Sequence, residues 1–178
     1  MSDEPAWLML VYRVPSNPSR LRAAVWRRLK SAGAVYLANS VAVLPESSEA
    51  ERILRTLRAE VEQMGGSGQV LRVEALAGQA DIVAAFNAAR DAEYTEVLSR
   101  CADFQAEIDK ESRAEKFTYA ELEENEEDLA KLRGWLDKIR TRDRLGASRA
   151  QEAGTAVESC AAALEGFAER VYAAEANQ

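Results

Sequence analysis

The chain of 178 residues contains no histidine and only two cysteines, Cys101 and Cys160. Without histidine it lacks the commonest general base and a frequent metal ligand, and the two cysteines form no CxxC pair. Zinc fingers, zinc hydrolases, disulfide frameworks and the usual nucleophilic triads are therefore not expected. We expect a protein that is not an enzyme and that carries no cofactor.

Long apolar runs are missing as well, because no window approaches the roughly twenty apolar residues that a membrane span needs. Free thiols suit a reducing compartment, so we expect a cytoplasmic protein without a membrane partner. All four prolines lie within residues 1–45. The rest of the chain is thus free of the residue that most strongly interrupts helices.

Charge divides the chain into two parts. Up to residue 75 there are ten Lys or Arg against eight Asp or Glu, and beyond it there are thirteen against twenty-two. The shift falls in the Ala75–Gln79 stretch. It predicts an α+β domain over residues 1–76 and an acidic helical domain over residues 77–178.

The segment from Pro5 to Pro45 contains no acidic residue. Its six basic residues are Arg13, Arg20, Arg22, Arg27, Arg28 and Lys30. In a chain of formal net charge −7, such a block indicates a positive surface at which an anion can bind.

The first part alternates apolar runs with amphipathic stretches and turn residues. Strands are predicted over about 7–12, 35–37, 40–44 and 69–76, and helices over about 17–33 and 47–64. The first helix should be capped by Asn17, take Pro18 at its first position and end at Gly33. The order strand, helix, strand, strand, helix, strand predicts a ferredoxin-like fold, with two helices on one face of a four-stranded antiparallel sheet.

The second part shows strong helical periodicity. Long helices are predicted over about 79–112, from Thr118, and over about 148–174, and Thr118 with Glu121 forms a capping box. The apolar seams are Val97, Cys101, Phe104 and Ile108; Leu122, Asn125, Leu129, Leu132, Leu136 and Ile139; and Val157, Cys160, Leu164, Phe167 and Val171. These helices either form a bundle or wrap the sheet domain. The cysteines are interpreted as small core residues, and Asn125 as a residue that sets helix register.

The first helix carries the candidate binding residues. A helical wheel puts Arg22, Trp26 and Lys30 in one row and Arg20 and Arg27 on the other flank of the apolar stripe. Such a row suits phosphate contact with an aromatic ring beside it, but it equally suits a solvated basic helix whose Trp26 covers the edge of the sheet. The candidate DNA- or anion-binding residues are Arg13, Arg20, Arg22, Trp26, Arg27, Arg28 and Lys30.

Arg28 stands apart from the other cations of this helix. The wheel places it near the middle of the buried stripe, where a charge needs a partner or an anion. We therefore expect Arg28 to be buried.

The run Glu121–Asp128 contains six carboxylates. Glu123 and Glu127, at helical spacing, are weak candidates for binding a hard cation. The simpler interpretation is an acidic helix start that interacts favourably with the helix dipole and continues as a solvated face.

Several short motifs carry a resemblance to a known family. They are Trp7-Leu-Met-Leu, Arg22-x-x-x-Trp26-Arg27-x-Leu29-Lys30-x-x-Gly33-Ala34, Val41-x-x-Leu44-Pro45, Phe86-x-x-x-Arg90-x-x-Glu93-Tyr94-x-x-x-Leu98 and Phe117-Thr-Tyr-Ala-Glu-Leu-Glu-Glu-Asn-Glu126 with Leu132-Arg-x-Trp135. Together they resemble the N-terminal domain of the ChrB family of chromate-resistance regulators. The resemblance implies a bacterial cytoplasmic protein tied to chromate efflux, in a short form that ends where the larger C-terminal domain of fuller members would begin.

Two functions follow from the basic helix and the resemblance. The preferred hypothesis is a chromate-responsive DNA-binding transcriptional regulator, a homodimer whose acidic half pairs the subunits. Chromate would then be an effector, held by Arg13, Arg28 or a helix N-terminus near Ser19. The alternative is a non-enzymatic accessory or scaffold protein that does not bind DNA. Its basic helix would dimerise the protein or dock a partner's acidic surface, such as another subunit's Glu121–Asp128 run. A nuclease of similar topology is not expected, because Tyr12 and Arg13 stand where a carboxylate would be needed.

Overall fold

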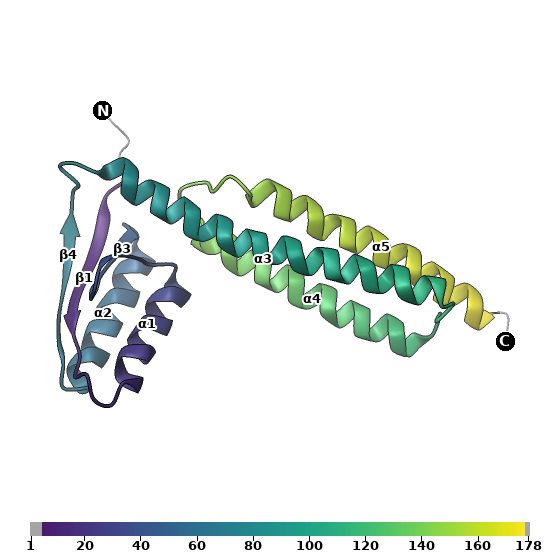
Figure 1. Cartoon of the computed structure of the whole chain (residues 1–178), viewed down its shortest axis with the longest axis horizontal. Helices are drawn as coiled ribbons and strands as arrows, with labels where there is room; N and C mark the ends of the chain where they lie inside the picture. Colours follow the sequence, from purple (N-terminus) through teal and green to yellow (C-terminus); the bar gives the residue numbers. More distant parts are fainter. Residues whose placement is uncertain (1–4, 177–178) are drawn as a thin grey trace. The chain divides into compact units, whose positions relative to one another are not determined.

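The structure is a computed structural model that describes residues 5–176 (Figure 1). It divides into two compact units, residues 1–86 and residues 87–178. The composition placed the boundary at residue 76, whereas the structural division falls inside a long helix that begins in the first unit. Among the described residues, no helix combines the length and the apolar character that a membrane crossing requires.

The first unit contains a four-stranded sheet. Its strands are β1 (Trp7–Arg13), β2 (Val35–Ala38), β3 (Val41–Pro45) and β4 (Ser67–Val73). They lie in the order β2-β3-β1-β4, and every neighbouring pair is antiparallel. Helices α1 (Arg20–Ala32) and α2 (Ser48–Gln63) cover one face of this sheet (Figure 1). The predicted α+β architecture with its ferredoxin-like element order is confirmed.

Helix α1 begins later than predicted. Its N-cap is Ser19 rather than Asn17, and the Asn17–Pro18 peptide bond is cis. The carbonyl of Pro18 accepts from Leu21 N at 3.1 Å, and the helical ladder starts only after this turn. The predicted end is confirmed: Gly33 has φ 83°, a left-handed conformation that glycine adopts without a Cβ penalty.

Both helices of the first unit bury an apolar stripe. Val25 and Leu29 of α1 are fully buried. The buried side chains of α2 are Ala50, Leu54, Leu57 and Val61. Ser47 caps α2, accepting from Ala50 N at 3.0 Å. Both helices are thus fixed by narrow apolar stripes, which leaves their outer faces to polar residues.

The helical part contains α3 (Gln79–Arg113), α4 (Tyr119–Arg142) and α5 (Ala150–Ala176). Every residue of the three predicted seams is buried, and all of them except Asn125 belong to one hydrophobic cluster of the second unit. Its buried members come from these helices and from Ala147 in the link before α5. The helices therefore form a bundle with its own core, which the periodicity alone did not decide.

Candidate nucleic-acid interface

Helix α1 presents an outer face that is positively charged throughout. Its five cations are all exposed, and the helix contains no acidic residue. These cations are Arg20, Arg22, Arg27, Arg28 and Lys30. Along 13 residues at 1.5 Å per residue the helix is about 20 Å long. One short element therefore carries most of the acid-free segment's charge.

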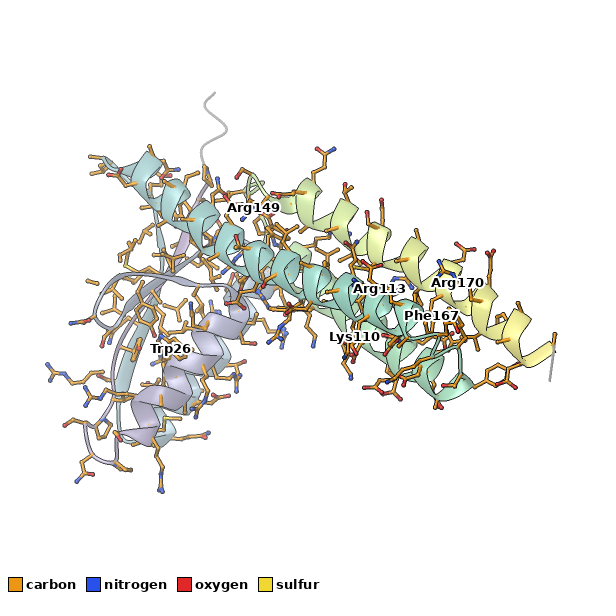
Figure 2. All side chains as sticks on the ribbon, turned by 45° about the vertical axis from the view of Figure 1, so that its right-hand side comes forward. Trp26, Lys110, Arg113, Arg149, Phe167 and Arg170 are labelled. Carbon is orange, nitrogen blue, oxygen red and sulfur yellow. The ribbon has the colours of Figure 1, made fainter. Side chains whose placement is uncertain are left out.

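Trp26 lies among these cations and is 49% exposed, which is unusual for so large an apolar side chain (Figure 2). Lys30 Nζ lies 5.6 Å from the centroid of its ring, within the range of a cation–π contact. Trp26 and Lys30, which the helical wheel places in one row, are thus in contact. The face offers a partly open aromatic ring beside a positive charge, a combination suited to stacking and phosphate contact.

The prediction that Arg28 is buried is wrong. Its side chain is 51% exposed, and its Nη1 lies 2.9 Å from Glu60 Oε1 of α2. The fully buried stripe of α1 is narrow, consisting of Val25 and Leu29. The long Arg28 stem therefore leaves the stripe at its edge, where the guanidinium reaches the neighbouring helix and solvent together.

The other four cations of α1 differ from Arg28. Within residues 5–176, no acidic side chain forms an ion pair with any of them, namely Arg20, Arg22, Arg27 and Lys30. A cation without a nearby carboxylate keeps its full field toward solvent. Four uncompensated charges thus lie on one face of a protein whose net charge is −7.

Arg13 lies apart from this helix, at the exposed end of β1. Its backbone is closely packed, because a Cβ placed on Gly66 would lie 2.2 Å from the Arg13 carbonyl oxygen. Gly66 therefore lets the chain leaving α2 pass directly over the end of β1. The structure brings Trp26 and Lys30 together and joins Arg28 to α2, while Arg13 occupies a separate position.

A pair of tyrosines lies at the sheet and adds no charge. The hydroxyls of Tyr12 and Tyr36 are 2.8 Å apart. Burial and the contact with Tyr12 raise the pKa of Tyr36 above its ordinary value. The phenol of Tyr36 is therefore neutral at physiological pH and does not offset the cations of α1.

The weak cation-binding candidates Glu123 and Glu127 are exposed on α4. Among the described residues, no group of three or more metal-ligating side chains is arranged to hold an ion. Both positions therefore remain part of the solvated acidic face of the helix.

Two polar clusters of the bundle escaped the sequence interpretation. In the first, Arg90 is 3% exposed and its Nε lies 3.0 Å from Glu93 Oε2. Arg142 Nη2 lies 3.0 Å from Glu93 Oε1, and Tyr94 donates to Asp143 Oδ2 at 2.9 Å. Burial lowers the pKa of the Arg90 guanidinium from its ordinary value. The feature of the sequence that could have indicated this cluster was the spacing of Arg90, Glu93 and Tyr94, which puts the three residues on one face of a helix.

The second cluster contains a buried carboxyl group. Glu111 is 4% exposed, and Asn125 Nδ2 donates to its Oε2 at 2.7 Å. Burial raises the pKa of Glu111 above its ordinary value. The sequence placed Asn125 on the seam of α4, but it did not predict that Glu111 would be its hydrogen-bond partner. The spacing of Phe104, Ile108 and Glu111 continues the seam of α3 and was the signal that pointed to an inward acid.

These elements define the class of protein: a ferredoxin-like domain with a cationic first helix, followed by a three-helix bundle. The family model for the N-terminal part of Protein ChrB matches residues 22–178. The chain therefore belongs to the ChrB N-terminal family, which is associated with chromate resistance.

A curated relative supports this assignment. The chain is 30% identical over 116 residues to Protein ChrB of Cupriavidus metallidurans, and the match covers 64% of this chain. It covers 35% of the relative, so the chain spans about a third of that protein's length. No solved structure matches the chain.

Proposed function

We propose that the protein is a non-enzymatic, DNA-binding regulatory module of chromate resistance, and that α1 is its DNA contact. The observation that supports this function is the set of four exposed α1 cations without acidic partners in the described structure, with the half-exposed Trp26 among them. These cations form no salt bridge within the described structure, so salt bridges of the fold do not account for them. A polyanion could contact all four.

The geometry of α1 suits a phosphate backbone. The helix is about 20 Å long, and double-stranded DNA carries a phosphate every 3.4 Å or so along each strand. Several phosphates thus lie within reach of a single cationic face. Because the remaining protein surface is acidic, binding should be weak at physiological salt and should strengthen steeply as salt is lowered.

The test is a titration of the full chain with duplex DNA from its own promoter region at several salt concentrations. If four cations contact phosphates, the logarithm of the association constant should fall against that of the salt concentration with a slope of about −4. Arg22→Ala with Arg27→Ala should reduce the magnitude of this slope by about 2.

The matched control removes the same charge from α2. Arg52→Ala with Arg55→Ala deletes two arginines that are paired to Glu49 and Glu51 on their own helix. We expect this variant to bind DNA much as the parent chain does. Absence of binding at low salt, or an equal loss in the α2 variant, would contradict the proposal.

The family resemblance makes chromate the proposed effector. The promoter titration is repeated with chromate and with sulfate, a tetrahedral dianion of the same charge, at equal ionic strength. We expect chromate to weaken DNA binding and to raise the melting temperature of the free protein, because a ligand that binds the native state stabilises it. Equal effects of the two anions would show a response to ionic strength alone.

A further inference from the structure

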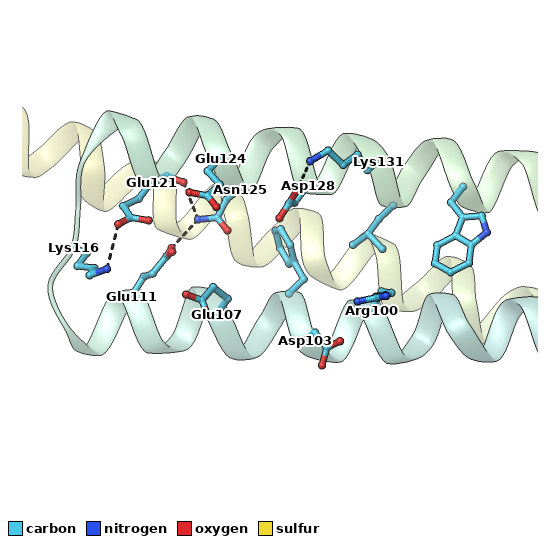
Figure 3. Close-up of a pocket in the computed structure, with 13 residues that line it drawn as sticks. Arg100, Asp103, Glu107, Glu111, Lys116, Glu121, Glu124, Asn125, Asp128 and Lys131 are labelled. Atoms are coloured by element: carbon cyan, nitrogen blue, oxygen red, sulfur yellow. Dashed lines mark hydrogen bonds and ion pairs between the residues drawn. The ribbon is translucent and has the colours of Figure 1, made fainter.

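The bundle contains a groove between α3 and α4 that the function proposed above does not use (Figure 3). Its volume is about 740 Å³. Phe104, Leu132 and Trp135 supply its apolar lining, and Trp135 is only partly buried. We name this feature the α3/α4 groove. Phe104 and Leu132 are 7% and 8% exposed, so Trp135 is the apolar side chain that the groove offers most openly to solvent. A partly exposed aromatic ring in a groove is typical of a surface that receives a side chain from a partner.

The rims of the groove are acidic. Six carboxylates and three cations line it. The carboxylates are those of Asp103, Glu107, Glu111, Glu121, Glu124 and Asp128, and the cations are those of Arg100, Lys116 and Lys131. The groove therefore has an excess of negative charge, which favours a cationic occupant.

The carboxylates of the groove are not all engaged. Asp128 pairs with Lys131 at 2.8 Å and Glu121 pairs with Lys116 at 3.3 Å (Figure 3). Asp103 on α3 and Glu124 on α4 are exposed, and neither forms an ion pair among the residues that the structure describes. Both rims thus hold a carboxylate that a cation from outside can approach.

The same chain carries a surface of matching chemistry and length. Helix α1 has an exposed tryptophan and four cations that have no acidic partner within residues 5–176. It is about 20 Å long, and the α4 rim from Glu121 to Trp135 is of similar length at 1.5 Å per residue. Complementary charge, an apolar anchor and equal length favour α1 of another molecule as the occupant.

We propose that the α3/α4 groove binds helix α1 of a second copy of this chain. Trp26 packs on the apolar lining, and the α1 cations face Asp103 and Glu124. The contact joins two different surfaces, so it is heterologous. Each copy has one α1 and one groove and can therefore form the contact on both sides. Its rim charges make association faster and stronger at low salt.

This contact is separate from DNA binding, although both use α1. When α1 lies in a groove its cations are covered, so self-association and DNA binding compete. A variant of the groove alone therefore separates the two activities, because it removes the docking surface and leaves α1 intact.

The experiment is sedimentation of the full chain over a wide range of protein and salt concentrations. The groove variant is Asp103→Lys with Glu124→Lys, and the helix variant is Arg22→Glu with Arg27→Glu. All four positions are exposed, so the fold should be retained. Each variant alone should raise the dissociation constant of self-association about tenfold or more. An equimolar mixture of the two should associate again, because the unchanged α1 of the groove variant then meets the unchanged groove of the helix variant, and the acidic α1 meets the basic groove.

The matched control is Asp109→Lys with Glu123→Lys, which makes the same charge change on exposed positions of α3 and α4 that do not line the groove. It should associate like the parent chain. A parent chain that is monomeric at every concentration, an equal loss in the control, or a mixture that fails to associate would each overturn the proposal. DNA binding that survives in the groove variant while self-association is lost shows that the two proposals stand separately.

Discussion

Helices α1 and α2 pack on the same face of one sheet, yet they differ in whether their basic residues are paired with acidic ones. On α2 each arginine is matched by a glutamate three or four residues away, in the pairs Arg52–Glu49, Arg55–Glu51 and Arg58–Glu62. On α1 there are five cations and no acid, and one of the five, Arg28, pairs with Glu60 of α2. Pairs along a helix stabilise the helix itself. An unmatched row contributes little to the fold and is available to a partner.

The largest expected effect concerns the ends of these two helices. Gly66→Ala, just after α2, should destabilise the protein by about 3 kcal/mol or more, because the new Cβ would lie 2.2 Å from the Arg13 carbonyl oxygen. Gly33→Ala at the end of α1 should cost about 1 kcal/mol, since it forces alanine into φ 83°. Urea denaturation of both variants measures the difference, and equal losses would show that the close approach at Gly66 is relieved by backbone movement.

The second prediction contrasts exposed charge with buried charge. Glu111→Gln should stabilise the protein at neutral pH by about 1 kcal/mol, because it replaces a buried carboxyl group with an amide that can still accept from Asn125. Burial raises the pKa of Glu111. The contribution of Glu111 to the free energy of unfolding is therefore fully present below the ordinary glutamate pKa and is lost as the pH rises through the raised pKa.

Denaturation of the parent chain and the Glu111→Gln variant across acidic and neutral pH checks this sign. The two stabilities should converge below the ordinary glutamate pKa of 4.5 and separate above it. Glu107, Lys116 and Glu121 also face this region, so Glu107→Gln, at an exposed position, is the control. A gap between parent and variant that is constant with pH would exclude titration of Glu111 as its cause.

The third prediction tests the contrast between the two helices directly. Glu51→Arg removes the pair with Arg55 at 2.7 Å and an acid from the first turn of α2, and should cost about 0.5–1 kcal/mol. Arg27→Glu on α1 should change the free energy of unfolding by less than about 0.5 kcal/mol, because it breaks no ion pair among the described residues. Thermal unfolding at low salt compares them. A larger loss for Arg27→Glu would mean that the α1 charges support the fold.

The smallest expected effect concerns the ion pair between α1 and α2. Arg28→Gln or Glu60→Gln should each cost about 0.5 kcal/mol, since a pair with a 51% exposed guanidinium is largely screened by water. The double variant should cost little more than either single one, which a double-mutant cycle measures. A coupling free energy between Arg28 and Glu60 well above about 0.5 kcal/mol would mean that Arg28 contributes substantially to the packing of α1 on α2.

Sequence patterns predicted the buried faces of α3, α4 and α5 more accurately than the buried face of α1. The seam residues of α3, α4 and α5 recur at a fixed helical period, and a period determines which side of a helix is buried. The cap at Thr118 was likewise recognisable, because it depends on residues close in the chain; its side chain accepts from Glu121 N, three residues further on. Local signals of this kind do not depend on how distant elements pack.

The position of Arg28 and its pairing with Glu60 were not predictable from a helical wheel. A wheel gives the direction of each side chain around α1 but not the angle at which α1 meets the sheet and α2. That angle narrows the fully buried stripe to Val25 and Leu29 and turns Arg28 toward α2. The α3/α4 groove was missed for the same reason, since its lining comes from two helices whose relative register is set by packing.

The three tryptophans of the chain occupy three different surroundings. Trp7 is 1% exposed, Trp26 is 49% exposed and Trp135 lines the groove. Their fluorescence should therefore resolve into a blue-shifted emission that iodide does not quench, a red-shifted emission that it quenches readily, and an intermediate one. The protein thus contains native optical reporters of its core, its basic helix and its acidic groove: DNA should shield Trp26 alone, whereas self-association should shield Trp26 and Trp135 together.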